Sequence, residues 1–82
     1  MKKIISAPDY LLQLGFIQRL EGNPFFEKIA DNVYYSEKED LTFKYQHEED
    51  NLDGNIVVYS DSEEKISKFE KKVLEMIGEK IE

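Results

Sequence analysis

Residues 41–60 of this 82-residue chain read Leu-Thr-Phe-Lys-Tyr-Gln-His-Glu-Glu-Asp-Asn-Leu-Asp-Gly-Asn-Ile-Val-Val-Tyr-Ser. Apolar and polar residues alternate over 41–46, which is typical of a strand with one buried face. The β-branched run at 55–59 predicts a second strand. Asp53-Gly54 precedes that run. Because both residues tolerate positive φ angles, the pair predicts a hairpin turn between the two strands.

A long amphipathic helix is predicted over residues 61–78. Ser60 with Glu63, or Asp61 with Glu64, supplies the side-chain oxygen and the carboxylate of an N-terminal capping box. Apolar residues recur there at steps of three and four, so they form one stripe that we expect to pack on strands 41–46 or 55–59. The stripe consists of Ile66, Phe69, Val73, Ile77 and Ile81.

The first third of the chain leaves alternatives open. A short helix is predicted over residues 7–14, with Ser6 as its cap and Gly15 as its left-handed stop. The alternative is a helix that continues to Glu21 and ends before Pro24. In the shorter version, residues 16–20 are free to form a strand.

Further strand signals lie between these helices. Residues 33–35 predict a third strand, and a turn at Asp31-Asn32 would make residues 25–30 a fourth. The alternative for 24–30 is a single helical turn that begins at Pro24. The predicted fold is therefore one α+β domain spanning 1–82. It has a short N-terminal helix, an antiparallel meander of three to five strands and a long C-terminal helix on one sheet face.

The charge is concentrated in the middle of the chain. The net charge is −7, and residues 31–64 hold eleven acidic and two basic side chains. An acidic surface of this kind favours a basic partner protein over nucleic acid, because opposite charges steer association. The alternative is a solubility device. The two acidic runs, which we take as candidate partner-binding residues, are Glu37, Glu39 and Asp40, followed by Glu48, Glu49, Asp50 and Asp53.

Tyr34 and Tyr35 are two further candidates for partner binding. Neighbouring residues of a strand point to opposite faces, so one of these tyrosines is expected to face solvent. Exposed tyrosines beside carboxylates are common anchors at protein interfaces. The alternative is ordinary cross-strand packing within the sheet.

Catalytic and metal-binding motifs are lacking in the sequence. The segment from Glu49 to Ser60 resembles part of a calcium loop, but its twelfth position is serine where a bidentate glutamate is needed. His47 is the only histidine, and its neighbours in sequence give it no nucleophile to activate. There is no cysteine. We therefore expect neither enzyme activity nor a metal or cofactor.

These observations predict a small acidic protein-binding module. Its expected role is that of an inhibitor or neutraliser, of the immunity, antitoxin or phage anti-defence type. It would occlude a basic surface of a nuclease or defence effector, with nucleic-acid mimicry as one version. The alternative is a structural or assembly protein that self-associates, for example as a homodimer, through a sheet edge. A short chain without cysteine, signal peptide or membrane span also predicts a cytoplasmic bacterial or phage protein.

Overall fold

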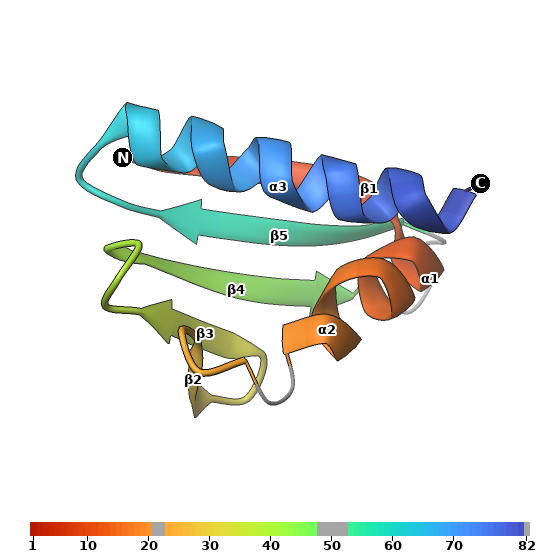
Figure 1. Cartoon of the computed structure of the whole chain (residues 1–82), viewed down its shortest axis with the longest axis horizontal. Coiled ribbons are helices and arrows are strands. Elements are labelled where there is room, and N and C mark those ends of the chain that lie inside the picture. Colours follow the sequence, from red (N-terminus) through yellow and green to blue (C-terminus); the bar gives the residue numbers. More distant parts are fainter. Residues whose placement is uncertain (21–22, 48–52, 82) are drawn as a thin grey trace.

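The computed structural model describes residues 1–20, 23–47 and 53–81. They form a five-stranded antiparallel sheet with the order β1-β5-β4-β3-β2 and with helices on one face (Figure 1). Strands β2 to β5 follow one another as a meander, and β1 adds to its far edge. The α+β prediction is confirmed. The strands are β1 (Lys2–Pro8), β2 (Glu27–Ala30), β3 (Val33–Ser36), β4 (Leu41–His47) and β5 (Asp53–Tyr59).

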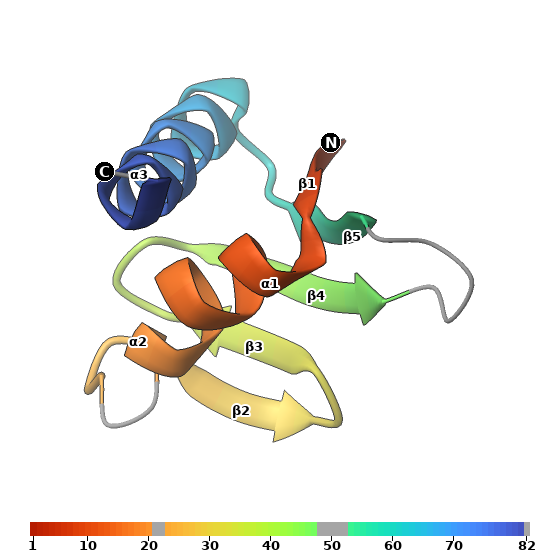
Figure 2. The same cartoon turned by 90° about the vertical axis from the view of Figure 1, so that its right-hand side faces the viewer.

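The core lies between the sheet and the helices. The C-terminal helix α3 (Glu63–Ile81) and the N-terminal helical segment lie on the same side of the sheet (Figure 2). Phe69, Val73 and Ile77 belong to one buried cluster with the inward side chains of β4 and β5, as the sequence predicts. The rings of Phe43 and Phe69 are 5.1 Å apart between centroids. Phe43 also contacts the rings of Phe16, Phe26 and Tyr34.

The N-terminal helical segment is longer than the short helix preferred from the sequence. It consists of α1 (Asp9–Leu12), a π-helical turn η1 (Gln13–Ile17) and α2 (Gln18–Leu20). Gly15 therefore does not stop the helix, and the predicted strand at 16–20 is wrong. The physical reason is the spacing of the buried residues Leu12, Phe16 and Leu20, which recur every fourth position. That spacing keeps one apolar face on the core.

Strand β1 is absent from the sequence-based expectations. Ser6 does not cap a helix; it lies within β1, and its hydroxyl donates to Asn55 Oδ1 at 2.6 Å. The helix begins after Pro8, which makes no side-chain capping bond. Local patterning could not reveal this strand because its partner β5 lies far from it along the chain.

The start of β5 and both ends of α3 differ from the predicted boundaries. Asp53 and Gly54 belong to β5 rather than to a turn. A Cβ on Gly54 would lie only 2.7 Å from Asp9 Oδ1, so glycine at this position permits a close approach. The cap of α3 is Ser62, whose hydroxyl accepts from the Lys65 N–H at 3.5 Å, and α3 continues past Gly78.

The segment before β3 forms a strand rather than a helical turn. Strand β2 pairs with β3 in an antiparallel register that shifts between Lys28 and Ala30. Asn32 makes the turn with φ of 60°, a left-handed conformation that asparagine tolerates well. The fourth-strand alternative for 25–30 is therefore the correct one.

Candidate functional site

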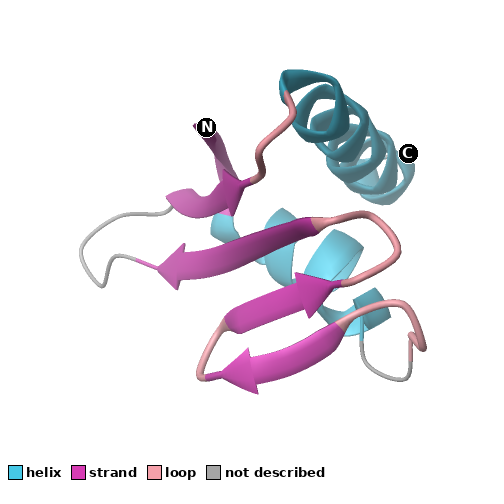
Figure 3. Cartoon of the chain, turned by 90° about the vertical axis from the view of Figure 1, so that its left-hand side faces the viewer, coloured by secondary structure: helices cyan, strands magenta, loops and turns pink. Residues whose placement is uncertain are grey.

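One face of the sheet has no described helix on it, and we call it the open face. Figure 3 shows the strands in front of the short N-terminal helical segment. Open-face positions alternate with the core residues of each strand. One register row crosses all five strands, and because directly opposed residues share a face, its side chains lie next to one another. This cross-strand row consists of Lys2, Tyr59, Thr42, Tyr35 and Glu27.

A hollow lies against this row. We call it the tyrosine hollow, because Tyr35 and Tyr59 flank Thr42 within it; these tyrosines are 36% and 45% exposed. Methionine and tyrosine provide apolar area, while the neighbouring carboxylates provide a polar rim, which is the usual anatomy of a protein-binding surface. The lining residues are Met1, Tyr35, Asp40, Leu41, Thr42, Tyr59, Ser60 and Asp61.

The two tyrosines singled out from the sequence face opposite ways, as strand geometry requires. Tyr34 points to the core and stacks on Phe43 with ring centroids 5.0 Å apart. Tyr35 lies on the open face in register with Thr42. The expectation that one of the pair faces solvent is confirmed for Tyr35, whereas Tyr34 packs across strands.

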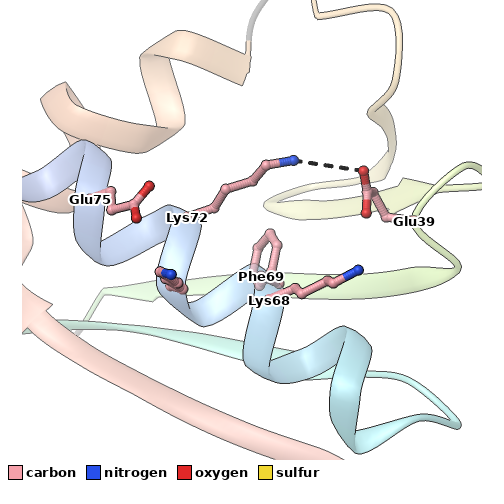
Figure 4. Close-up of a pocket in the computed structure, with 6 residues that line it drawn as sticks. Glu39, Lys68, Phe69, Lys72 and Glu75 are labelled. Atoms are coloured by element: carbon pink, nitrogen blue, oxygen red, sulfur yellow. Dashed lines mark ion pairs between the residues drawn. The ribbon is translucent and has the colours of Figure 1, made fainter.

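The first acidic run lies in the turn between β3 and β4. Lys65 Nζ is 2.7 Å from Asp40 Oδ2, and Lys72 Nζ is 3.7 Å from Glu39 Oε1 (Figure 4). The hydrogen bond and charge of Lys65 lower the pKa of Asp40, and the same contact raises the pKa of Lys65. Two carboxylates of this run are therefore partly neutralised by α3. Glu37 lines a separate hollow beside Phe25.

The second acidic run follows β4 along the chain, whereas the first run precedes it. Asp53 begins β5 and is aligned with Pro8 of β1. Glu48, Glu49 and Asp50 lie outside the described residues. Because the first run precedes β4 and Asp53 follows it, the described candidate carboxylates do not gather at one end of the sheet.

His47 has a carboxylate partner that its sequence neighbours did not suggest. Its Nδ1 lies 3.1 Å from Asp9 Oδ2, and the Tyr45 hydroxyl donates a hydrogen bond to Asp9 Oδ1. Burial, followed by the hydrogen bond to Asp9, raises the pKa of Tyr45 to about 12. This arrangement holds the start of α1 against β4 and adjoins no serine, threonine or cysteine nucleophile in the contacts described for it.

Sequence reasoning missed Met1, Thr42, Tyr59 and Asp61 as members of one surface. The alternation in β4 and β5 places Thr42 and Tyr59 on the polar face, but only the register shows that Tyr35 joins them. Among the described residues, no group of three or more acidic or histidine side chains could hold a metal ion. None of the described helices combines the length and apolarity needed to cross a membrane.

Comparison with protein-family models finds no match for this sequence. Neither curated proteins nor solved structures give a match. The assignment of a role therefore rests on the chemistry of the open face and of the acidic turn beside it.

Proposed function

We propose that this chain is a small non-enzymatic protein-binding module whose tyrosine hollow contacts a basic partner protein in the cytoplasm. The role that fits such a contact is that of an inhibitor or neutraliser that occludes the basic surface. The observation that carries the proposal is the placement of two exposed tyrosines in one row, next to the carboxylates of Asp40 and Asp61.

The tyrosines supply the binding energy in this proposal. Tyrosine buries a large rigid surface with few rotatable bonds and still offers a hydroxyl for hydrogen bonding. Tyr35 and Tyr59 are held by the sheet backbone, so little ordering is needed when they meet a partner. Their exposure leaves their outer surfaces accessible to a binding protein.

The carboxylates supply selectivity. Asp61 is 81% exposed at its side chain and lies 4.0 Å from Lys65, so its charge is only weakly compensated. Acidic groups at the rim of an interface raise the association rate with a basic surface and disfavour acidic partners. The nucleic-acid-mimic version receives less support, because Glu39 and Asp40 are already paired with lysines of α3.

The proposal is tested by capture followed by kinetics. The tagged protein is incubated with lysate of the source organism at low and high salt, and the captured protein is purified for surface binding measurements. We expect Tyr59→Ala and Tyr35→Ala each to weaken binding by tenfold or more, which corresponds to about 1.4 kcal/mol. Tyr10→Ala is the matched control, because Tyr10 is exposed on α1 away from the hollow.

Charge-reversal variants test which acidic residues contribute to partner binding. Asp61→Lys should slow association, whereas Glu75→Lys on α3 should change it little. The triple reversal of Glu48, Glu49 and Asp50 to lysine tests the second run independently. If both tyrosine variants bind as tightly as the wild type while the triple reversal abolishes binding, recognition belongs to the 48–50 segment and the tyrosine hollow is not the site.

A further inference from the structure

Strand β1 forms one edge of the sheet, and no described strand pairs with its outer side. The Ser60 N–H donates to the Met1 carbonyl at 3.1 Å. This bond shows which residues of β1 are hydrogen-bonded to β5 and which are not. In an antiparallel ladder the hydrogen-bonded positions alternate with positions whose backbone groups point away. The N–H and C=O groups of Lys2, Ile4 and Ser6 therefore point outward from this edge.

Exposed apolar side chains lie on both sides of the β1 edge. Ile4 is 55% exposed on the open face, where it pairs in register with the buried Val57. On the helical side, Glu70 of α3 accepts a hydrogen bond from Lys3 at 2.9 Å. Leu74 lies one helical turn further along the same flank of α3 and is half exposed.

We propose that two copies of this chain form a symmetric dimer through antiparallel pairing of their β1 strands, with Ile4 on the two-fold axis. Lys2 then lies opposite the partner's Ser6, and Ile4 lies opposite the partner's Ile4. Each hydrogen-bonded pair of such a ladder exchanges two N–H···O bonds, so all the outward groups of residues 2, 4 and 6 are satisfied. The two sheets become one.

Several registers would place the outward-pointing residues of the two β1 strands opposite one another. The charged side chains of the strand favour the register that has Ile4 on the axis. An axis at Lys3 would place two lysines directly opposite each other, which is destabilising. An axis at Ile5 would place Lys2 opposite the partner's Pro8, which has no N–H to donate, so this register would form fewer hydrogen bonds. With Ile4 on the axis, the two Lys2 residues lie about 13 Å apart along the strands, beyond the screening length of about 8 Å at physiological ionic strength.

The helices extend the same interface. Strand β1 and helix α3 run alongside each other (Figure 1), and Glu70 reaches Lys3, the neighbour of Ile4. One helical turn rises about 5.4 Å and one strand residue about 3.4 Å, so Leu74 lies within a few ångströms of the level of Ile4. The two-fold axis therefore brings Leu74 of each copy toward the other above the new strand pair, where both lose exposed apolar surface.

The first experiment uses the fact that the chain has no cysteine. In a hydrogen-bonded antiparallel pair the Cα atoms lie about 5.5 Å apart, which suits a disulfide. Ile4→Cys should oxidise to a covalent dimer at least about tenfold faster than Ile29→Cys. Ile29 is the matched control because it is 56% exposed and lies on β2, the opposite edge of the sheet. Equal rates for the two variants would overturn the proposed axis.

The second experiment measures the dimer without a cross-link. Sedimentation should show a concentration-dependent dimer of the wild-type protein. Ile4→Lys should weaken it by tenfold or more, because two lysines would meet on the axis, whereas Ile29→Lys should not. Circular dichroism of both variants confirms that the fold is kept. A wild-type protein that sediments as a monomer at all concentrations would overturn the proposal.

Salt distinguishes this dimer from the proposed basic partner. Two copies with net charge −7 repel each other, so the dimer should tighten as salt rises. Binding of a basic partner should weaken over the same range. The dimer does not depend on the tyrosine hollow, so Tyr59→Ala should leave the sedimentation of the protein unchanged. A dimer that dissociates as salt rises would contradict the proposed interface.

Discussion

The two faces of the sheet are built from alternate residues of the same strands, yet they differ in how much of their side-chain surface is buried. On the covered face, Phe43, Ile56 and Val58 are fully buried beneath the helices. On the open face, the intervening positions hold Tyr59, Thr42 and Lys44. The covered face can be changed only at the expense of the fold. On the open face Val57 is also buried, but the exposed positions can be changed with little effect on the fold.

This contrast separates stability from recognition. Burial of apolar area drives folding, so residues of the covered face are constrained by packing. Side chains of the open face contribute less to folding and are therefore available for a partner. Substitutions on the two faces, and at the contacts that join the sheet to the helices, test this separation.

The largest effect is expected for Phe69→Ala. Phe69 contacts the rings of Phe16, Phe26 and Phe43 in the core. Removing a buried aromatic ring costs about 3–5 kcal/mol, a large part of the stability of a small domain. Urea unfolding should show this loss, while Tyr35→Ala on the open face should change the unfolding free energy by about 0.5 kcal/mol. Equal losses for the two variants would contradict the division between the faces.

The next effect is a loss of stability at alkaline pH. The pKa of Tyr45 is raised from 10.0 to about 12, so the folded protein holds this proton more tightly than the unfolded chain does. The corresponding stabilisation is complete below pH 10 and is lost as the pH rises toward 12. It amounts to about 3 kcal/mol at most. Unfolding free energies of the wild type and Tyr45→Phe, measured from pH 9 to 12, should fall more steeply for the wild type.

A smaller effect is expected for Asp9→Ala. This change leaves the buried hydroxyl of Tyr45 without its carboxylate acceptor and removes the partner of His47. Losing the acceptor of a buried hydroxyl costs about 1–3 kcal/mol. In a double-mutant cycle with Tyr45→Phe, the two losses should be less than additive, because the same hydrogen bond is removed by either change. Additive losses would show that the bond does not couple the helix start to β4.

The smallest effect concerns the pair of Asp40 and Lys65. The lowered pKa of Asp40 means that its contribution is present above the ordinary value of 3.8 and is lost as the pH falls through the lowered value. Because both groups are exposed, Lys65→Met should shift the urea midpoint only slightly, and only at low salt. The difference between this variant and the wild type should shrink as the pH is lowered below 3.8, as Asp40 becomes protonated. A difference that stays constant as the pH falls would indicate an apolar packing role for Lys65.

The second half of the chain could be predicted well because its signals are local. The alternation in 41–46, the β-branched run at 55–59 and the helical stripe around Phe69 each specify one element. Their mutual packing follows, since two apolar faces of one small domain must meet. Even so, the two predicted caps, Ser60 and Asp61, lie two residues and one residue before the observed cap Ser62, because several polar residues there could perform that role.

The first third could not be predicted because its structure depends on distant contacts. Gly15 suggested a helix end, but the burial of Phe16 and Leu20 keeps the segment helical through a π-turn. Strand β1 requires β5 as its template. The tyrosine hollow was missed for the same reason, because strand register, rather than spacing along the chain, brings Tyr35 and Tyr59 together.

The pairing of β1 with β5 also determines the order in which the protein can fold. The meander from β2 to β5 closes through short connections, whereas the register of β1 joins Lys2 to Tyr59 across most of the chain. Contacts between distant residues form late, because closing a long loop loses more chain entropy. During synthesis, β1 must therefore wait unpaired until β5 has been made. At concentrations where the protein is monomeric, we expect the amides of β1 to show weaker hydrogen-exchange protection than those of the central strands β4 and β5.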